Sequence, residues 1–186
     1  TENLVVTKNH DLIATWQIDG AYFECVDEAD LTLLTDQLNT LIRSFDGKPV
    51  TFYDHRIRGK KSVQPTFKSK IPFVNRVMNA YYSSLSEAEY FENKLYISVC
   101  YKPFSAEDKV THFLSRKKGN KNIFEEPIND MNEICGRLST YLSRFHSRRL
   151  GLYEENNIVY SEQLTLFQKL LSGRWQKVRV TNSPFY

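Results

Sequence analysis

Two short apolar runs at the start of the chain predict strands. The runs LVVT at 4–7 and LIATWQI at 12–18 are rich in β-branched and aromatic residues. Between them, Asn9-His10-Asp11 favours a turn, and a third apolar run, AYFECV, follows Gly20. The chain is therefore predicted to open with a hairpin, followed by a further apolar segment.

Residues 27–47 carry the strongest helical pattern. Asp27 is predicted to cap this helix and Gly47 to end it, and acidic residues in the first turn suit the positive end of the helix dipole. The apolar positions recur three and four residues apart, which places them on one face of the predicted helix. They are Leu31, Leu34, Leu38, Leu41, Ile42 and Phe45.

The middle of the chain predicts a strand, a basic loop, a helix and a strand. VTFYDHRI at 50–57 suits a strand, and residues 58–70 lose all periodicity and predict an exposed loop. Pro72 suits the first turn of a helix. LYISVCYK at 95–102 follows Asn93-Lys94 as a strand that should end near Pro103. The apolar stripe of the helix is Phe73, Val74, Val77, Met78, Tyr81 and Tyr82.

The last third predicts two helices around a short hairpin. Residues 105–126 have no clear pattern, because RKKGNKN interrupts them. A long helix is predicted from Pro127, and LGLY and IVYS flank the turn Asn156-Asn157. Ser161 is predicted to cap a last helix that Gly173 ends. The apolar side of the long helix comprises Ile128, Met131, Ile134, Cys135, Leu138, Tyr141, Leu142 and Phe145.

This order of elements predicts an α/β (or α+β) fold, in which a mixed β-sheet is covered by helices. Strand–helix–strand units occur twice, which predicts two strand–helix–strand halves within a single domain, residues 1–186. A length of 186 residues suffices for one sizeable core. The chain starts at Thr1 without a methionine, and we interpret it as a piece of a longer protein.

Composition indicates an ordinary globular protein, with 41% hydrophobic and 25% charged residues. No apolar run approaches the length of a transmembrane helix, and no secretory signal is visible. The three cysteines, Cys25, Cys100 and Cys135, are far apart in the sequence. This spacing argues against a disulfide framework or a zinc site and fits a reducing compartment.

The net charge of +3 is modest, but the basic residues are clustered. Such clusters can contact an acidic partner, anionic lipid or nucleic acid, or can simply be solvated. Aromatic residues near them, such as Phe67, Tyr81 and Phe113, could stack on single-stranded bases, although core packing explains them better. The candidate partner or anion contacts are Arg56, Arg58, Lys60, Lys61, Arg116, Lys117 and Lys118.

The stretch RIRGKKS at 56–62 superficially resembles the end of a nucleotide-binding loop. Such a loop needs a glycine where this chain has Asp54, and a hydroxyl where it has Lys61. The four histidines form no metal-binding pattern, and no nucleophile elbow is present. We therefore predict no catalytic, cofactor-binding or metal residue in this chain.

Several segments, in their order, resemble the N-terminal domain of the type IV secretion and conjugation ATPases of the TrbE/CagE/VirB class. These segments are Trp16-Gln17-Ile18-Asp19-Gly20 with Phe23-Glu24, LNTLIRSF, VTFYDHRIR, LYISVCYKP and LGLYEENNIVYSEQLTLFQKLLSG. The resemblance spans nearly the whole chain and is weakest at about 105–126.

The resemblance implies a non-catalytic domain that docks and oligomerises a secretion ATPase, which energises pilus assembly and the transfer of DNA or protein. ATP and Mg would bind a C-terminal P-loop domain absent from this chain. Implied partners are other secretion-system subunits and further copies of the ATPase, at the cytoplasmic face of the bacterial inner membrane, with peripheral membrane contact. The alternative is a module of a conjugation apparatus that binds single-stranded nucleic acid through the basic loops.

Overall fold

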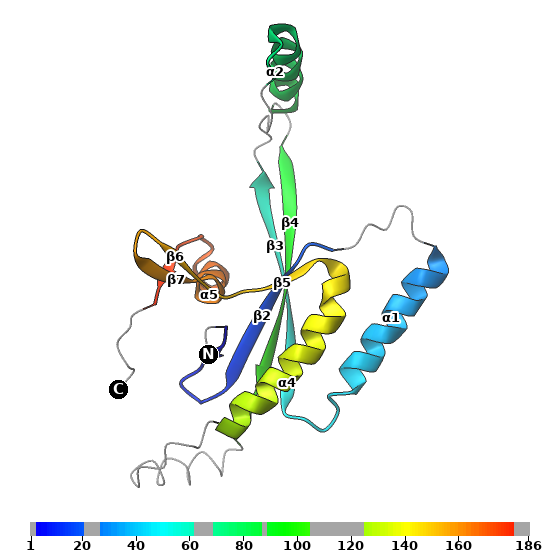
Figure 1. Cartoon of the computed structure of the whole chain (residues 1–186), viewed down its shortest axis with the longest axis vertical. Coiled ribbons are helices and arrows are strands. Elements are labelled where there is room, and N and C mark those ends of the chain that lie inside the picture. Colours follow the sequence, from blue (N-terminus) through cyan, green and yellow to red (C-terminus); the bar gives the residue numbers. More distant parts are fainter. Residues whose placement is uncertain (1–2, 21–26, 62–68, 87–88, 105–124, 181–186) are drawn as a thin grey trace. The chain divides into compact units, whose positions relative to one another are not determined.

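A computed structural model describes residues 3–20, 27–61, 69–86, 89–104 and 125–180 of the chain. Helices and strands alternate through this part of the chain (Figure 1). The strands are β1 (Val5–Val6), β2 (Leu12–Ile18), β3 (Val50–Lys61), β4 (Tyr90–Tyr101), β5 (Ser147–Arg149), β6 (Leu152–Glu155), β7 (Ile158–Ser161) and β8 (Val178–Arg179). The α-helices are α1 (Glu28–Arg43), α2 (Pro72–Ser86), α4 (Glu125–Leu142) and α5 (Glu162–Ser172), and a 3-10 turn spans Ser143–Phe145.

The chain divides into two compact units. The main unit comprises residues 1–55 and 96–186, and the ribbon unit comprises residues 56–95. The long strands β3 and β4 each contribute to both units. The ribbon unit thus contains the paired distal parts of these two strands and helix α2.

The larger sheet has the strand order β1-β2-β4-β3, and β5 also pairs with β2. Val5 lies opposite Ile13 and Trp16 lies opposite Arg149, both in antiparallel register. His10 adopts a positive φ of 65° in the turn between β1 and β2. The predicted front hairpin is confirmed, whereas the apolar run 21–26 lies outside the described residues.

Helix α4 supplies much of the core of the main unit. It packs on β2 and β5, and the Trp16 indole N–H donates to the Ser139 hydroxyl at 3.1 Å. The helix begins at Glu125, so Pro127 falls in its first turn, where its missing N–H costs nothing. The predicted apolar face is confirmed by the buried side chains Met131, Ile134, Cys135, Leu138 and Leu142.

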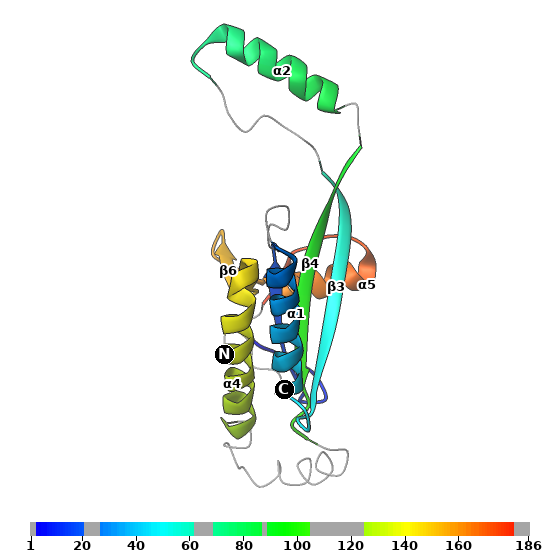
Figure 2. The same cartoon turned by 90° about the vertical axis from the view of Figure 1, so that its right-hand side faces the viewer.

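Helix α1 lies beside α4 and runs in the opposite direction (Figures 1 and 2). Asp27 occupies the predicted N-cap position, but its side chain makes no capping hydrogen bond. The helix ends at Arg43, before Gly47, which has a φ of 75° in the turn that follows. The predicted apolar face is only partly covered: Phe45, just past the helix, is buried, whereas Leu31, Leu38 and Ile42 are exposed. Its apolar side only partly meets α4.

Both long strands extend beyond their predicted limits. β3 continues to Lys61, so the prediction of a loop from residue 58 is wrong for 58–61. β4 begins at Tyr90 and includes Asn93, which the sequence placed before the strand. Its end at Tyr101 agrees with the predicted stop before Pro103. The two strands lengthen together because each satisfies the backbone hydrogen bonds of the other.

The second sheet has the order β6-β7-β8, with Tyr153 opposite Tyr160. The predicted hairpin turn is confirmed, since Asn156 and Asn157 both have positive φ angles, as a two-residue turn requires. Ser161 caps α5 by accepting from the Leu164 N–H at 3.2 Å, as predicted. Gly173 ends this helix with a φ of 72°, also as predicted.

Helices α4 and α5 lie on opposite faces of the larger sheet (Figure 2). Successive residues of a strand point to opposite faces. On β2, Trp16 contacts α4 through Ser139, whereas Gln17 faces Leu166 of α5 across a cleft. Both faces of β2 are therefore covered, which explains why this strand is the most buried of the fold.

The predicted α/β class is confirmed by helices packed on antiparallel sheets. The division into two strand–helix–strand halves stays a prediction. Two short strands, β5 and β8, were not predicted, because neither carries a run of apolar residues.

Candidate functional site

The predicted basic cluster lies on the distal part of β3. Arg56, Arg58 and Lys60 alternate along the strand and are exposed, whereas Ile57 and Gly59 between them are partly buried. A period of two places the three basic side chains on one face of the strand. The other predicted contacts, Arg116, Lys117 and Lys118, lie outside the described residues.

Neighbouring side chains on β4 and just before it compensate part of this positive charge. Lys60 forms an ion pair with Glu89, and Lys61 Nζ lies 3.3 Å from a Glu92 carboxylate oxygen. The Arg58 guanidinium lies 4.3 Å from the centre of the Phe91 ring. Non-covalent contacts therefore join the basic side chains of β3 to β4 and the residue before it, and the carboxylates partly neutralise the lysine charges.

The extended backbone of residues 56–61 differs from a nucleotide-binding loop. Such a loop wraps its backbone N–H groups around phosphate oxygens at the start of a helix. Here the backbone is committed to a strand paired with β4. The sequence argument from Asp54 and Lys61 is consistent with this geometry.

Charge is unevenly shared between the two units. Residues 56–95 contain eight lysines and arginines and three glutamates, a net charge of +5. Because the whole chain carries +3, the remaining residues together carry −2. The ribbon unit is thus a concentrated positive region in a weakly charged chain.

Helix α2 adds an exposed apolar stripe to the ribbon unit. Phe73, Val77 and Tyr81, spaced four residues apart, are 65%, 52% and 58% exposed. Asn75 fixes the start of the helix, since its side chain accepts from the Ser69 N–H at 2.8 Å and donates to the Ser69 carbonyl at 2.7 Å. The sequence predicted this apolar stripe but did not predict that it lies open to solvent.

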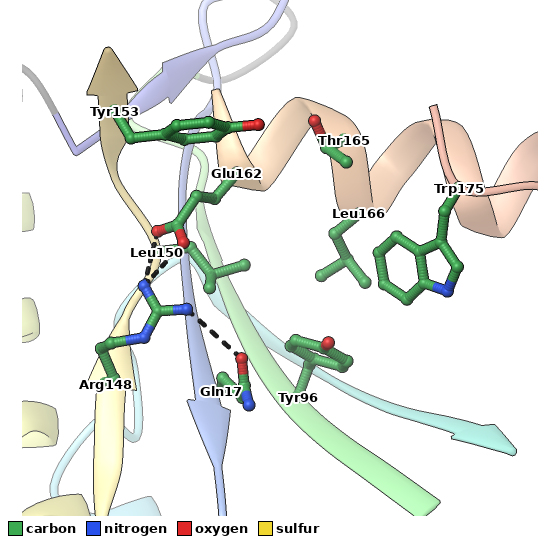
Figure 3. A pocket seen from close by; sticks show the side chains of 9 residues that line it. All are labelled: Gln17, Tyr96, Arg148, Leu150, Tyr153, Glu162, Thr165, Leu166 and Trp175. Carbon is green, nitrogen blue, oxygen red and sulfur yellow. Dashed lines mark hydrogen bonds and ion pairs between the residues drawn. The ribbon is translucent and has the colours of Figure 1, made fainter. Parts of the chain in front are cut away.

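A separate cleft of about 270 Å³ lies in the main unit (Figure 3). Leu150 and Leu166 form its apolar floor with Tyr96, and Tyr153 and Trp175 stand at its rim. These residues come from β4, β6, α5 and the connections around them. Half of the Trp175 side chain is exposed, so the hollow is open as well as apolar.

An ion pair forms the polar wall of the cleft. Arg148 Nη1 donates to both carboxylate oxygens of Glu162, at 2.8 and 2.6 Å, and its Nη2 approaches Gln17 (Figure 3). The Gly151 N–H also donates to Glu162, at 3.0 Å. Burial alone would raise the pKa of Glu162, but these hydrogen bonds and the Arg148 charge lower it. The wall therefore has no net charge.

A polar network crosses the sheet at His55. His55 Nε2 lies 3.0 Å from the Ser98 hydroxyl, which lies 2.8 Å from the Thr15 hydroxyl. Burial lowers the pKa of His55, although the Asp54 carboxylate opposes the shift. A serine beside a histidine can act as a nucleophile, but Ser98 is only 2% exposed, so the network holds strands together.

The described residues offer no cluster of three or more histidine, cysteine, aspartate or glutamate side chains arranged for a metal ion. Within the same ranges, every helix is too short or too polar to cross a bilayer. The two candidate sites are both surface features. One is the ribbon unit, with its basic residues and α2, and the other is the cleft beside α5.

These surfaces belong to a domain of the α/β class, in which helices pack on antiparallel sheets. Residues 3–108 match the family model for the N-terminal domain of the type IV secretion system ATPase VirB4/TrbE. The chain therefore belongs to the VirB4/TrbE family of type IV secretion ATPases, as its N-terminal domain.

Curated relatives extend this similarity over almost the whole chain. The chain is 31% identical to the type IV secretion system protein virB4 of Brucella suis biovar 1 (strain 1330), over 97% of the chain and 23% of the relative. It is 28% identical to the type IV secretion system protein PtlC of Bordetella pertussis (strain Tohama I / ATCC BAA-589 / NCTC 13251), over 99% of the chain and 23% of the relative. The chain thus spans about a quarter of these relatives.

Proposed function

We propose that residues 1–186 act as a non-catalytic docking and oligomerisation domain of a type IV secretion ATPase. In this proposal, ATP and Mg bind and react in a P-loop domain outside this chain. The full-length ATPase then energises pilus assembly and the transfer of DNA or protein. Family membership and the quarter-length match to the relatives support this division of labour.

The ribbon unit is the observation that carries the docking role. It combines a net charge of +5 with an exposed apolar helical stripe, and an exposed apolar stripe of this kind marks an interaction surface. A surface that is both apolar and charged is suited to a partner that is complementary in both respects. The proposed partners are other secretion subunits or a membrane surface at the cytoplasmic face of the inner membrane, and further copies of the ATPase.

The absence of catalysis is tested by measuring phosphate release. The 186-residue chain is compared with the full-length protein and with a full-length variant whose P-loop lysine is changed. We expect hydrolysis by the full-length protein alone. Steady hydrolysis by the 186-residue chain would refute the proposal.

Docking is tested by replacing three basic residues of β3. We expect Arg58→Ala, Lys60→Ala and Lys61→Ala together to leave the circular dichroism spectrum unchanged and to weaken binding to secretion subunits or to membranes. The matched control removes three exposed basic residues of the main unit, Lys8, Arg43 and Lys48. Equal binding by both triple variants would show that the ribbon does not dock.

A single-stranded nucleic-acid partner is the second candidate. The observation in its favour is the contact of Arg58 with the half-exposed Phe91 ring, because bases stack on such surfaces. Binding to labelled single-stranded DNA is measured at increasing salt. Affinity through this surface should fall steeply as salt rises, and no binding at low salt would eliminate the candidate.

A further inference from the structure

We propose that helix α2 lies in the interface of an anionic bilayer, with Phe73, Val77 and Tyr81 inserted among the acyl chains and the basic residues of the ribbon unit against the lipid headgroups. This inference rests on the docking role proposed above and names the partner of that surface. The proposal rests on two features of the same 40-residue unit: an exposed apolar stripe and an excess of positive charge.

The apolar side of α2 has the form of an interfacial helix. Its three exposed apolar residues lie at a spacing of four, so they share one side of the helix, and Ile71 just before it is 58% exposed. Two of the three are aromatic, and aromatic rings favour the boundary between headgroups and acyl chains. Insertion would remove this surface from water, which is its main driving force.

The polar residues of α2 carry no negative charge, and its other large apolar residues, such as Val74 and Met78, are partly buried. The polar residues are asparagines and serines, Arg76 is the one charged residue of the helix, and Lys70 stands just before it. Both basic side chains belong to exposed residues. An acidic residue would oppose an anionic surface, whereas the charges here attract one.

The dimensions of α2 favour lying on the bilayer over crossing it. Its 15 residues span about 22 Å as a helix, less than the hydrocarbon thickness of a bilayer. Its polar residues, including Asn75 and Asn79, would also be buried in a spanning arrangement. A helix parallel to the surface keeps them in contact with water and headgroups.

An acidic protein partner or a second copy of this chain would also meet positive charge. Lipid is favoured because two residues of the stripe are aromatic and α2 carries no carboxylate that an anionic surface would repel. The two protein partners are therefore treated as alternative outcomes of the test.

The first measurement is sedimentation of the 186-residue chain with vesicles. We expect binding to vesicles of equal parts phosphatidylglycerol and phosphatidylcholine, and at least tenfold weaker binding to phosphatidylcholine alone. Lys70→Ala with Arg76→Ala should weaken the first interaction about thirtyfold, at about fivefold per charge. Phe73→Ser with Val77→Ser should weaken it at least tenfold.

The matched control alters exposed apolar residues in the main unit. Leu33 and Ile42 of α1 are 55% and 48% exposed, close to the values in α2. Leu33→Ser with Ile42→Ser should leave vesicle binding unchanged. Equal losses in the two pairs would indicate general stickiness and overturn the proposal.

The second measurement locates the helix in the bilayer. Phe73→Trp, in a chain with Trp175→Phe, introduces a fluorophore into the stripe while Trp16 stays buried. We expect lipids brominated on their acyl chains to quench this tryptophan, and to leave unquenched the tryptophan of the control Leu33→Trp. Equal quenching of both, or of neither, would overturn insertion by α2.

The outcomes separate this inference from the docking role. The chain could fail to bind anionic vesicles and still bind secretion subunits. If the Phe73 and Val77 changes abolish that subunit binding, the stripe contacts a protein and the docking role stands. Self-association without lipid that the same changes abolish would assign it to a second copy. Either result overturns the lipid assignment.

Discussion

Glu162 should contribute more to stability than its ion-pair partner Arg148. The carboxylate of Glu162 accepts from the Gly151 N–H as well as from Arg148, and Glu162 N–H donates in turn to the Gly151 carbonyl at 2.9 Å. Arg148 has a side chain that is 57% exposed, against 27% for Glu162. The Glu162 carboxylate therefore connects the start of α5 both to Arg148 of β5 and to the backbone at Gly151.

These contacts set the expected magnitudes. A hydrogen bond from a backbone N–H to a carboxylate contributes about 1.5–3 kcal/mol, whereas an exposed ion pair contributes about 0.2–1 kcal/mol. Glu162→Ala should therefore lower the free energy of unfolding by about 2 kcal/mol. Arg148→Ala should cost less than about 1 kcal/mol, because it leaves the backbone hydrogen bond in place.

Urea unfolding followed by circular dichroism measures both variants and the double variant. For a loss of about 2 kcal/mol, the midpoint should fall by about 1 M at an unchanged slope. The control pair is Glu133 and Arg137 of α4, both exposed, in which Arg137 Nη2 lies 2.5 Å from Glu133 Oε1. Glu133→Ala should cost about 0.5 kcal/mol or less. Losses for Arg148→Ala as large as for Glu162→Ala would refute the reasoning.

Three further changes test other parts of the fold. Burial lowers the pKa of His55, so the folded protein binds this proton more weakly than the unfolded chain, in which the pKa is 6.5. The contribution of neutral His55 to the free energy of unfolding is therefore complete above pH 6.5 and is lost as the pH falls below it. Between pH 7.5 and 5.5, the urea midpoint should fall less in His55→Gln than in the wild type. Ser161→Ala should cost about 1 kcal/mol in urea unfolding by removing the cap of α5, and an unchanged midpoint would contradict this. Met131→Ala, at a fully buried site, should cost about 2–5 kcal/mol by the same assay, far more than Val77→Ala on the exposed stripe.

Periodicity predicted where helices and strands occur, but it did not show which apolar faces are covered. The stripe of α4 and the stripe of α2 look alike in sequence. Met131 and Ile134 of α4 are buried, whereas Phe73 and Val77 of α2 are exposed. A period reports that one side of a helix is apolar, and only the tertiary structure determines what lies against it.

The true end of β3, at Lys61, agrees with a pattern that is visible in the sequence. Arg56, Arg58 and Lys60 alternate with Ile57 and Gly59, which is the period of a strand. The high charge of this stretch suggested a loop instead. Its carboxylate partners, Glu89 and Glu92, lie about 30 residues further along the chain, so a pattern of neighbouring residues does not reveal the pairing.

The cleft beside α5 was beyond prediction from local patterns. Its walls combine Gln17, Tyr96, Arg148 and Glu162, which are brought together by the pairing of β2 with β5 and by the packing of α5. Each residue alone has an ordinary role in a strand or a helix. Arg148 and Glu162 lie 14 residues apart in different elements, so no local pattern identifies them as partners.

The cross-strand pairs also change how the basic ribbon should be perturbed. Lys60 offsets Glu89, whereas Glu92 is paired with both Lys61 and Lys94, so replacing Lys60 and Lys61 removes the ion pair of Glu89 and one of the two ion pairs of Glu92. With Arg58 also replaced, the net charge of the ribbon unit falls from +5 to +2. Changes at Lys70 and Arg76 remove positive charge beside α2 without exposing these carboxylates. They therefore test attraction to an anionic surface more directly than changes on β3, where lost attraction and new repulsion act together.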